Sequence, residues 1–132
     1  MKLTRLLLLV ITVAAFVAMA GCRPQVSPQD ADSIKRNYTD FRNVVMSRDA
    51  GKATTFASSD LVALYTPEKI LASFEYLTNS NMKTGSHTRV SLDRNSKGRA
   101  WLFPGAPPTV GYAFVKETNV WKITLDVCPV LD

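Results

Sequence analysis

Few side chains in this sequence have the chemistry for acid–base, nucleophilic or metal reactions. There is one histidine, His87, two cysteines, Cys22 and Cys128, and 11 aspartates and glutamates. A catalytic base of the isomerase type is a carboxylate in an apolar pocket, with a tyrosine, histidine or protonated acid as partner. No acid is spaced to predict contact with His87, which we interpret as an exposed residue at a strand edge. One histidine and one usable cysteine cannot form a zinc tetrad, and no calcium loop is present, so we expect no metal and no cofactor.

Five acidic residues have a structural explanation. Those in predicted first turns of helices stabilise the helix dipole, and others lie in a turn or on the solvent side of a strand. These are Asp30, Asp32, Glu68, Asp93 and Asp126. Asp60 and Glu75 have no such role, but neither has a predicted partner. The sequence therefore favours a non-enzymatic protein and leaves an enzyme open.

Cys22 follows a segment with the composition of a signal peptide. Lys2 and Arg5 provide positive charge, and residues 6–20 are apolar apart from Thr12. A membrane-spanning helix needs about 20 apolar residues, so this shorter run fits a signal peptide better than a permanent span. The run ends at small residues, Ala20 and Gly21, which allow an extended backbone to enter a peptidase cleft.

The residues Met19-Ala20-Gly21-Cys22 resemble the lipobox of bacterial lipoproteins, although Met19 replaces the commoner leucine. The resemblance implies cleavage after Gly21 and attachment of a diacylglyceryl group to the Cys22 thiol. Two or three acyl chains hold a protein at a membrane essentially permanently, so the membrane is the expected partner. Arg23, in place of an aspartate after the cysteine, favours the periplasmic face of the outer membrane if the host has two membranes. The alternative is a plain secretory signal followed by a disulfide-forming cysteine.

Cleavage changes the charge and leaves one thiol. Removal of Lys2 and Arg5 lowers the 16 basic side chains to 14 against 11 acidic ones, a net charge of about +3. This mild excess does not predict nucleic-acid binding. Once Cys22 is acylated, Cys128 has no intramolecular partner in an oxidising compartment. Cys128 is then either a small buried residue or the link in a disulfide-bonded dimer.

The pattern of the chain predicts a signal peptide over 1–21, a tether over 22–28 and one α+β domain over 29–132. Ser27-Pro28-Gln29-Asp30 is typical of a helix start, and apolar residues recur at helical spacing from Ile34. We expect this helix to end with Gly51 as its cap. A short second helix is predicted over 52–58. A third begins at Thr66-Pro67-Glu68 and ends near residue 79, with Tyr76 on its buried side.

From about Lys83 the apolar period changes from helical to alternating. Strands are predicted over 87–92, 99–103, 109–116 and 120–127. In the last of these, Trp121 and Ile123 alternate with polar residues, as in an antiparallel sheet with one buried face. The predicted architecture is three N-terminal helices packed on the concave face of a curved antiparallel sheet of about four strands.

This pattern resembles the nuclear-transport-factor-like superfamily, whose cone-shaped fold also hosts ketosteroid isomerases and polyketide cyclases. The resemblance depends on residues 44–51 at the end of the first helix, the short helix after it, the helix from Pro67 and the final residues 119–123. The chain departs from the family pattern in having few strands. It implies a cavity between helices and sheet, lined by the aromatic residues Tyr38, Phe41, Phe74, Trp101, Tyr112, Phe114 and Trp121. The alternative is that these aromatics simply fill the core. Fold in such a superfamily does not determine activity.

Basic residues concentrate in one predicted hairpin. Residues 83–99 hold five basic side chains and one acid, Asp93. This is either a solvated hairpin or a surface, centred on Arg94, Lys97 and Arg99, that contacts anionic lipid headgroups or a cell-wall polymer. The leading hypothesis is a non-enzymatic envelope lipoprotein that binds another protein or such a polymer. The alternatives are a carrier or sensor of a small apolar ligand and, less favoured, an isomerase-like or cyclase-like enzyme.

Overall fold

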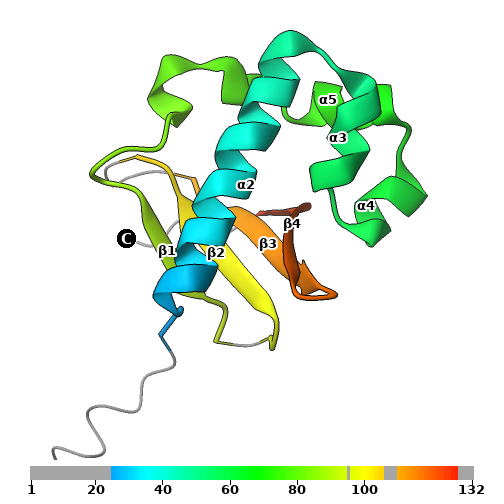
Figure 1. The fold of residues 1–132 in the computed structure, drawn as a ribbon. Helices are drawn as coiled ribbons and strands as arrows, with labels where there is room; N and C mark the ends of the chain where they lie inside the picture. Colours follow the sequence, from blue (N-terminus) through cyan, green and yellow to red (C-terminus); the bar gives the residue numbers. More distant parts are fainter. Residues whose placement is uncertain (1–24, 95, 106–109, 128–132) are drawn as a thin grey trace, which may run out of the picture.

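The computed structural model describes residues 25–94, 96–105 and 110–127. Over these ranges the helices come first and the strands second (Figure 1). The α-helices are α2 (Pro28–Ser47), α3 (Ala50–Phe56), α4 (Ser59–Leu64) and α5 (Pro67–Ser73), followed by the 3-10 helices η1 (Glu75–Thr78) and η2 (Ser80–Met82). The strands β1 (Arg89–Leu92), β2 (Arg99–Phe103), β3 (Tyr112–Glu117) and β4 (Val120–Val127) form one antiparallel sheet in that order. The predicted α+β class and four-stranded antiparallel sheet are confirmed.

Helix α2 begins where its cap residues predict and ends earlier than expected. The Ser27 hydroxyl accepts a hydrogen bond from the Asp30 N–H at 3.1 Å, and Pro28 occupies the first turn. The expectation that Gly51 caps this helix is wrong, because Arg48 takes the left-handed conformation at φ 56° and Gly51 lies inside α3. The reason is Asp49, whose side chain caps α3 by accepting from the Lys52 N–H.

The region after α3 contains a helix that the sequence did not predict. Ser58 caps α4 through its hydroxyl, which accepts from the Leu61 N–H at 3.3 Å. The described ranges therefore hold four α-helices instead of the expected three. α5 begins at Thr66 and Pro67 as predicted, but the chain tightens into 3-10 geometry after Ser73. The change in helical period leaves Tyr76 48% exposed, so its predicted burial is wrong.

The strands match the alternating pattern closely. β2 and β4 have the predicted bounds, whereas β1 begins at Arg89 and β3 at Tyr112. A two-residue turn joins β3 to β4, with Thr118 at φ 49° and Asn119 at φ 63°, as a tight hairpin requires. The register places Tyr112 beside Leu102, and a bulge follows between Tyr112 and Ala113.

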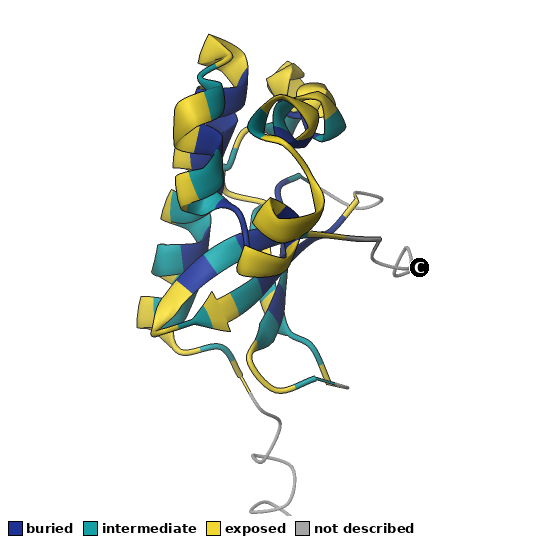
Figure 2. Cartoon of the chain, turned by 90° about the vertical axis from the view of Figure 1, so that its right-hand side faces the viewer, coloured by how far each residue is buried: buried dark blue, intermediate teal, exposed yellow. Residues whose placement is uncertain are grey.

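The core lies between α2 and one face of the sheet, with α3, α4 and α5 around the β4 side (Figure 1). Buried residues, dark blue in Figure 2, occur in both the helices and the strands. Among the described residues, every core residue lies between Ile34 and Ile123, so a chain that begins at residue 22 keeps all of them. Within the described ranges, the helices are too short or too polar to cross a membrane.

Candidate functional site

The aromatic residues proposed to line a cavity are mostly packed against one another. The rings of Phe41 and Phe74 meet edge to face at 5.0 Å and 90°, and those of Tyr38 and Tyr112 are 5.4 Å apart. Tyr76 continues the chain of contacts by stacking on Tyr112 at 5.9 Å. Tyr38 and Phe41 are 0% exposed. These contacts occur between α2 and the sheet, where the predicted cavity would lie.

The structure does not bring Trp101 into this cluster. Its neighbours Ala100 and Leu102 belong to the core, and side chains alternate along a strand, so Trp101 lies on the opposite face of the sheet. There the Arg99 guanidinium lies 5.9 Å from the centroid of the Trp101 ring. Phe114 and Trp121 do belong to the core, with Trp121 near the β3–β4 turn.

An open pocket lies beside the aromatic cluster. It has a volume of about 270 Å³ and is lined by Phe74, Tyr76, Val110, Gly111, Tyr112, Thr124 and Leu125. Behind it, the Tyr38 hydroxyl donates to the Met82 carbonyl at 2.7 Å, and the Tyr112 hydroxyl donates to the Met82 sulfur at 3.3 Å. The two most buried phenols are thus already hydrogen-bonded within the protein.

Burial raises the pKa of the Tyr38, Tyr76 and Tyr112 phenols above their ordinary value. A raised pKa in the folded state means that the unfolded chain loses these protons first, so stability is present below about pH 10 and decreases above it. We expect the two buried phenols, Tyr38 and Tyr112, to ionise only together with unfolding. Absorbance at 295 nm and circular dichroism, followed against pH, test this. Reversible ionisation of all tyrosines near pH 10 in a folded chain would contradict it.

A polar cluster fastens α2 to the β3–β4 hairpin. The Trp121 indole N–H donates to Asp30 Oδ1 at 2.8 Å, and Lys116 Nζ lies 3.1 Å from the same oxygen. The hydrogen bond from Trp121, and then that from Lys116, lowers the pKa of Asp30. Asn37 Nδ2 adds a hydrogen bond to the Trp121 carbonyl at 2.7 Å. Asp30 therefore does more than stabilise the helix dipole, and its role is structural.

An Asp30→Asn variant should be less stable than the parent at neutral pH by about 1 kcal/mol, because a charged acceptor at a partly exposed site is replaced by a neutral one. The lowered pKa of Asp30 stabilises the fold above about pH 4, and this contribution is lost as the pH falls through the folded-state pKa. The two proteins should therefore converge towards pH 2. Urea unfolding at pH 7 and at low pH measures the difference, and a pH-independent gap would contradict the account.

The other candidates for chemistry do not assemble into a site. His87, Asp60 and Glu75 are all exposed, and His87 lies in a turn just before β1. In the part of the chain that the structure describes, no three His, Cys, Asp or Glu side chains are placed to hold a metal ion. Cys22 and Cys128 lie outside the described residues.

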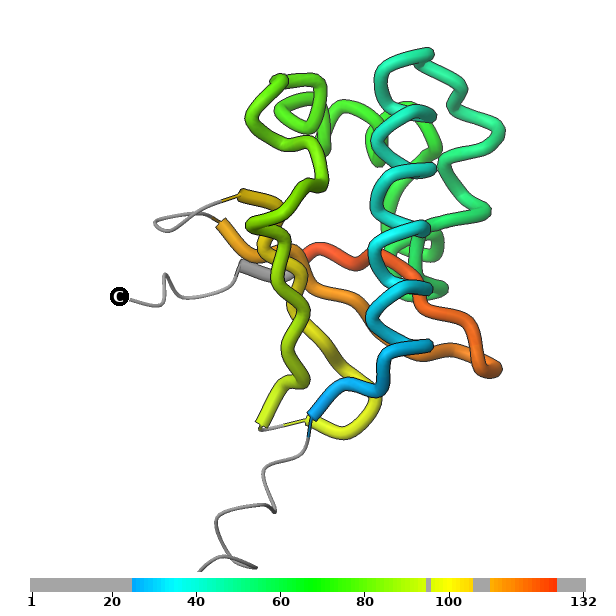
Figure 3. The backbone as a smooth tube through the Cα atoms, turned by 60° about the vertical axis from the view of Figure 1, so that its left-hand side comes forward, coloured from blue at the N-terminus to red at the C-terminus, as the bar shows by residue number. Residues whose placement is uncertain are grey.

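The three residues of the predicted basic surface differ in exposure. Arg94 and Lys97 are exposed on the β1–β2 hairpin, whereas Arg99 is half-buried against Trp101. The hairpin lies at the same end of the molecule as the start of α2 (Figure 3). Only two residues separate Gln25, the first described residue, from Cys22. The sequence did not indicate that Lys35, on α2, lies near this hairpin.

The described residues thus form a packed aromatic core, a small open pocket beside it and a basic end at the start of α2. They offer no assembled set of a nucleophile, a base and its partner. No protein-family model, curated protein or solved structure matches the chain.

Proposed function

We propose that this chain is a lipid-anchored protein of the cell envelope whose domain binds a partner through its surface and catalyses no reaction. The observation that carries the proposal is the run Met19-Ala20-Gly21-Cys22, which stands directly ahead of a domain with a complete core. Helix α2 starts six residues after Cys22, a span of at most about 22 Å. The domain would therefore stay close to the membrane surface. Arg23 favours the outer membrane, periplasmic side, in a host with two membranes.

The packed core supports surface binding over a buried site. Because Phe41 meets Phe74 and Tyr38 meets Tyr112, a small molecule would have to displace aromatic contacts to enter between α2 and the sheet. The partner would be another envelope protein or an anionic surface. The proposal needs no nucleic acid, metal or cofactor.

A second candidate function is a carrier or sensor of a small apolar ligand. The observation that favours it is the open pocket beside Tyr76 and Tyr112, whose volume of about 270 Å³ is close to the lower limit of ligand pockets, roughly 300 Å³. This alternative keeps the expectation of a curved, cone-like sheet of the nuclear-transport-factor type.

Fractionation of the native host tests the proposal. We expect the protein to remain with membranes through washes with high salt and alkaline carbonate and to be released by detergent, because acyl chains stay in the bilayer when surface charges are screened. Recovery in the soluble envelope fraction would contradict lipid anchoring. If mass spectrometry of the domain purified without detergent finds a bound apolar molecule, the alternative of an apolar-ligand carrier is favoured.

A further inference from the structure

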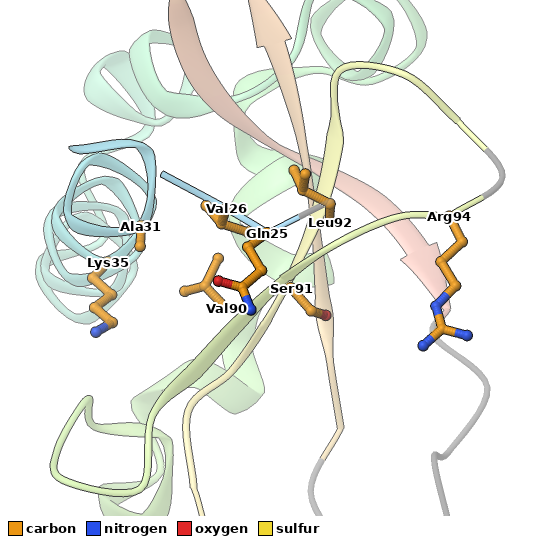
Figure 4. A pocket seen from close by; sticks show the side chains of 8 residues that line it. All are labelled: Gln25, Val26, Ala31, Lys35, Val90, Ser91, Leu92 and Arg94. Carbon is orange, nitrogen blue, oxygen red and sulfur yellow. The ribbon is translucent and has the colours of Figure 1, made fainter. Parts of the chain in front are cut away.

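A groove lies between the start of α2 and β1, the edge strand of the sheet (Figure 4). Its volume is about 530 Å³, and it is lined by Gln25, Val26, Ala31, Lys35, Val90, Ser91, Leu92 and Arg94. Val26, Val90 and Leu92 give it an apolar middle. Lys35 on α2 stands at one end and Arg94 on the hairpin at the other (Figure 4).

The groove is suited to a negatively charged ligand. Its lining contains two cations and no acid. Within the described ranges neither Lys35 nor Arg94 forms an ion pair, and the acid beside Arg94 in the sequence, Asp93, has an interaction of its own. A guanidinium and an ammonium are the side chains that bind phosphate oxygens best, the guanidinium with paired hydrogen bonds.

The position of the groove indicates the source of the anion. Gln25 and Val26 are part of the lining, and Gln25 is three residues from Cys22, at most about 11 Å of extended chain. If Cys22 carries the lipid, the groove must lie at the level of the headgroups around it. Anionic lipids attract basic residues at this level, whereas the apolar middle offers nothing to a free inorganic anion.

We propose that this groove binds an anionic glycerophospholipid of the membrane that holds Cys22, with its phosphate at Arg94 and its glycerol ester region against Val26, Val90 and Leu92, while Lys35 attracts the same anion from the other end. The inference rests on the proposed lipid anchor and extends it. The anchor limits only the distance of the domain from the membrane, whereas a second contact 13 residues along the chain, at Lys35, fixes its orientation. The end of the molecule that carries α3 and α5 is then turned away from the membrane, towards a partner.

The test uses the chain from residue 22 onward with Cys22→Ser, which keeps the whole core and carries no lipid of its own. The probe is dihexanoyl phosphatidylglycerol below its micelle concentration, and amide chemical shifts are followed by NMR. We expect one saturable site, with shifts confined to residues 25–35 and 89–94. A Lys35→Gln/Arg94→Gln variant should bind up to about thirtyfold more weakly, because each exposed cation contributes at most about 1 kcal/mol, or five- to sixfold, to the attraction for the phosphate.

The matched control is Lys52→Gln/Lys69→Gln, which removes the same charge from α3 and α5. It should change affinity less than twofold. An equal loss of affinity in both variants would show diffuse electrostatic attraction and contradict the proposed site. Inorganic phosphate or dihexanoyl phosphatidylcholine that causes the same chemical shift changes as the phosphatidylglycerol would contradict it too. If the double variant is less stable by thermal unfolding, Arg94→Gln alone, on the exposed hairpin, decides the matter with about a fivefold loss expected. The tested protein lacks Cys22, so a negative result would contradict the lipid-binding groove without bearing on the acylation of Cys22, which is tested separately.

Discussion

A Phe41→Ala variant of the domain is expected to lose about 3 to 5 kcal/mol of unfolding free energy, the range for removing a buried aromatic ring. Phe41 is 0% exposed and meets Phe74 edge to face at 5.0 Å, so the truncation leaves a cavity that its neighbours cannot fill. Small domains have only about 5 to 15 kcal/mol in total, so the variant should be close to unfolding at 37 °C. Urea denaturation followed by circular dichroism measures the loss.

The control is Met46→Ala on the same helix, where the side chain is 51% exposed. It should cost less than about 1 kcal/mol, since exposed substitutions rarely change stability much. A Phe41→Ala loss as small as that of Met46→Ala would mean that the region between α2 and the sheet is not packed. That result would contradict the filled core and favour the apolar-ligand carrier.

The second large effect concerns Cys22. A Cys22→Ser substitution in the full chain, expressed in the native host, should abolish incorporation of labelled palmitate, because the acyl group is attached through the thiol. Cleavage after Gly21 should fail as well, since the lipobox resemblance implies a peptidase that acts on the acylated form. The variant should therefore keep residues 1–21 and migrate more slowly than the parent on a denaturing gel.

Cys128→Ser is the matched control, because it removes the other thiol of the chain and leaves Cys22 in place. It should be labelled and cleaved like the parent. Normal cleavage of the Cys22→Ser variant would show a plain secretory signal. Loss of palmitate labelling in the Cys128→Ser variant would show that the acyl group is attached to Cys128 and would contradict the proposed anchor. A non-reducing gel of the same two proteins also tests the Cys128-linked dimer.

Local chemistry was predictable from the sequence. The start of α2 follows from Ser27 and Pro28, which act within one turn, and the bounds of β2 and β4 follow from alternation along the strand. The errors occurred where two local signals compete. Asp49 caps a new helix before Gly51 can end the old one, and the change to 3-10 geometry after Ser73 turns Tyr76 outward.

The candidate sites depend on contacts between distant residues, which a single sequence does not reveal. Asp30 and Trp121 are 91 positions apart and meet only because the β3–β4 hairpin packs beside α2. In the same way Lys35 joins Arg94 at one groove through the packing of β1. Arg99 was predicted to act with Arg94 and Lys97. Because Ala100, the next residue of β2, faces the core and side chains alternate along a strand, Arg99 lies on the other face of the sheet.

The proposed lipid attachment and orientation of the domain would together give the protein a simple physical role. The acyl chains would hold it at the bilayer, and the basic groove would keep one end against the headgroups. The opposite end, around α3 and α5, would then face the envelope space as the surface available to a partner. This end of the molecule carries a groove of about 560 Å³ between α2 and α5, bordered by Arg48, Glu68 and Glu75. The groove is the first surface to test for binding of that partner.

The mass of the N-terminal peptide, from protein purified out of host membranes, tests the central claim most directly. We predict a peptide that begins at Cys22 and carries a diacylglyceryl group on sulfur, with or without a further acyl chain on its amino group. A free thiol at position 22, or a peptide that still includes residues before it, would contradict the lipid anchor.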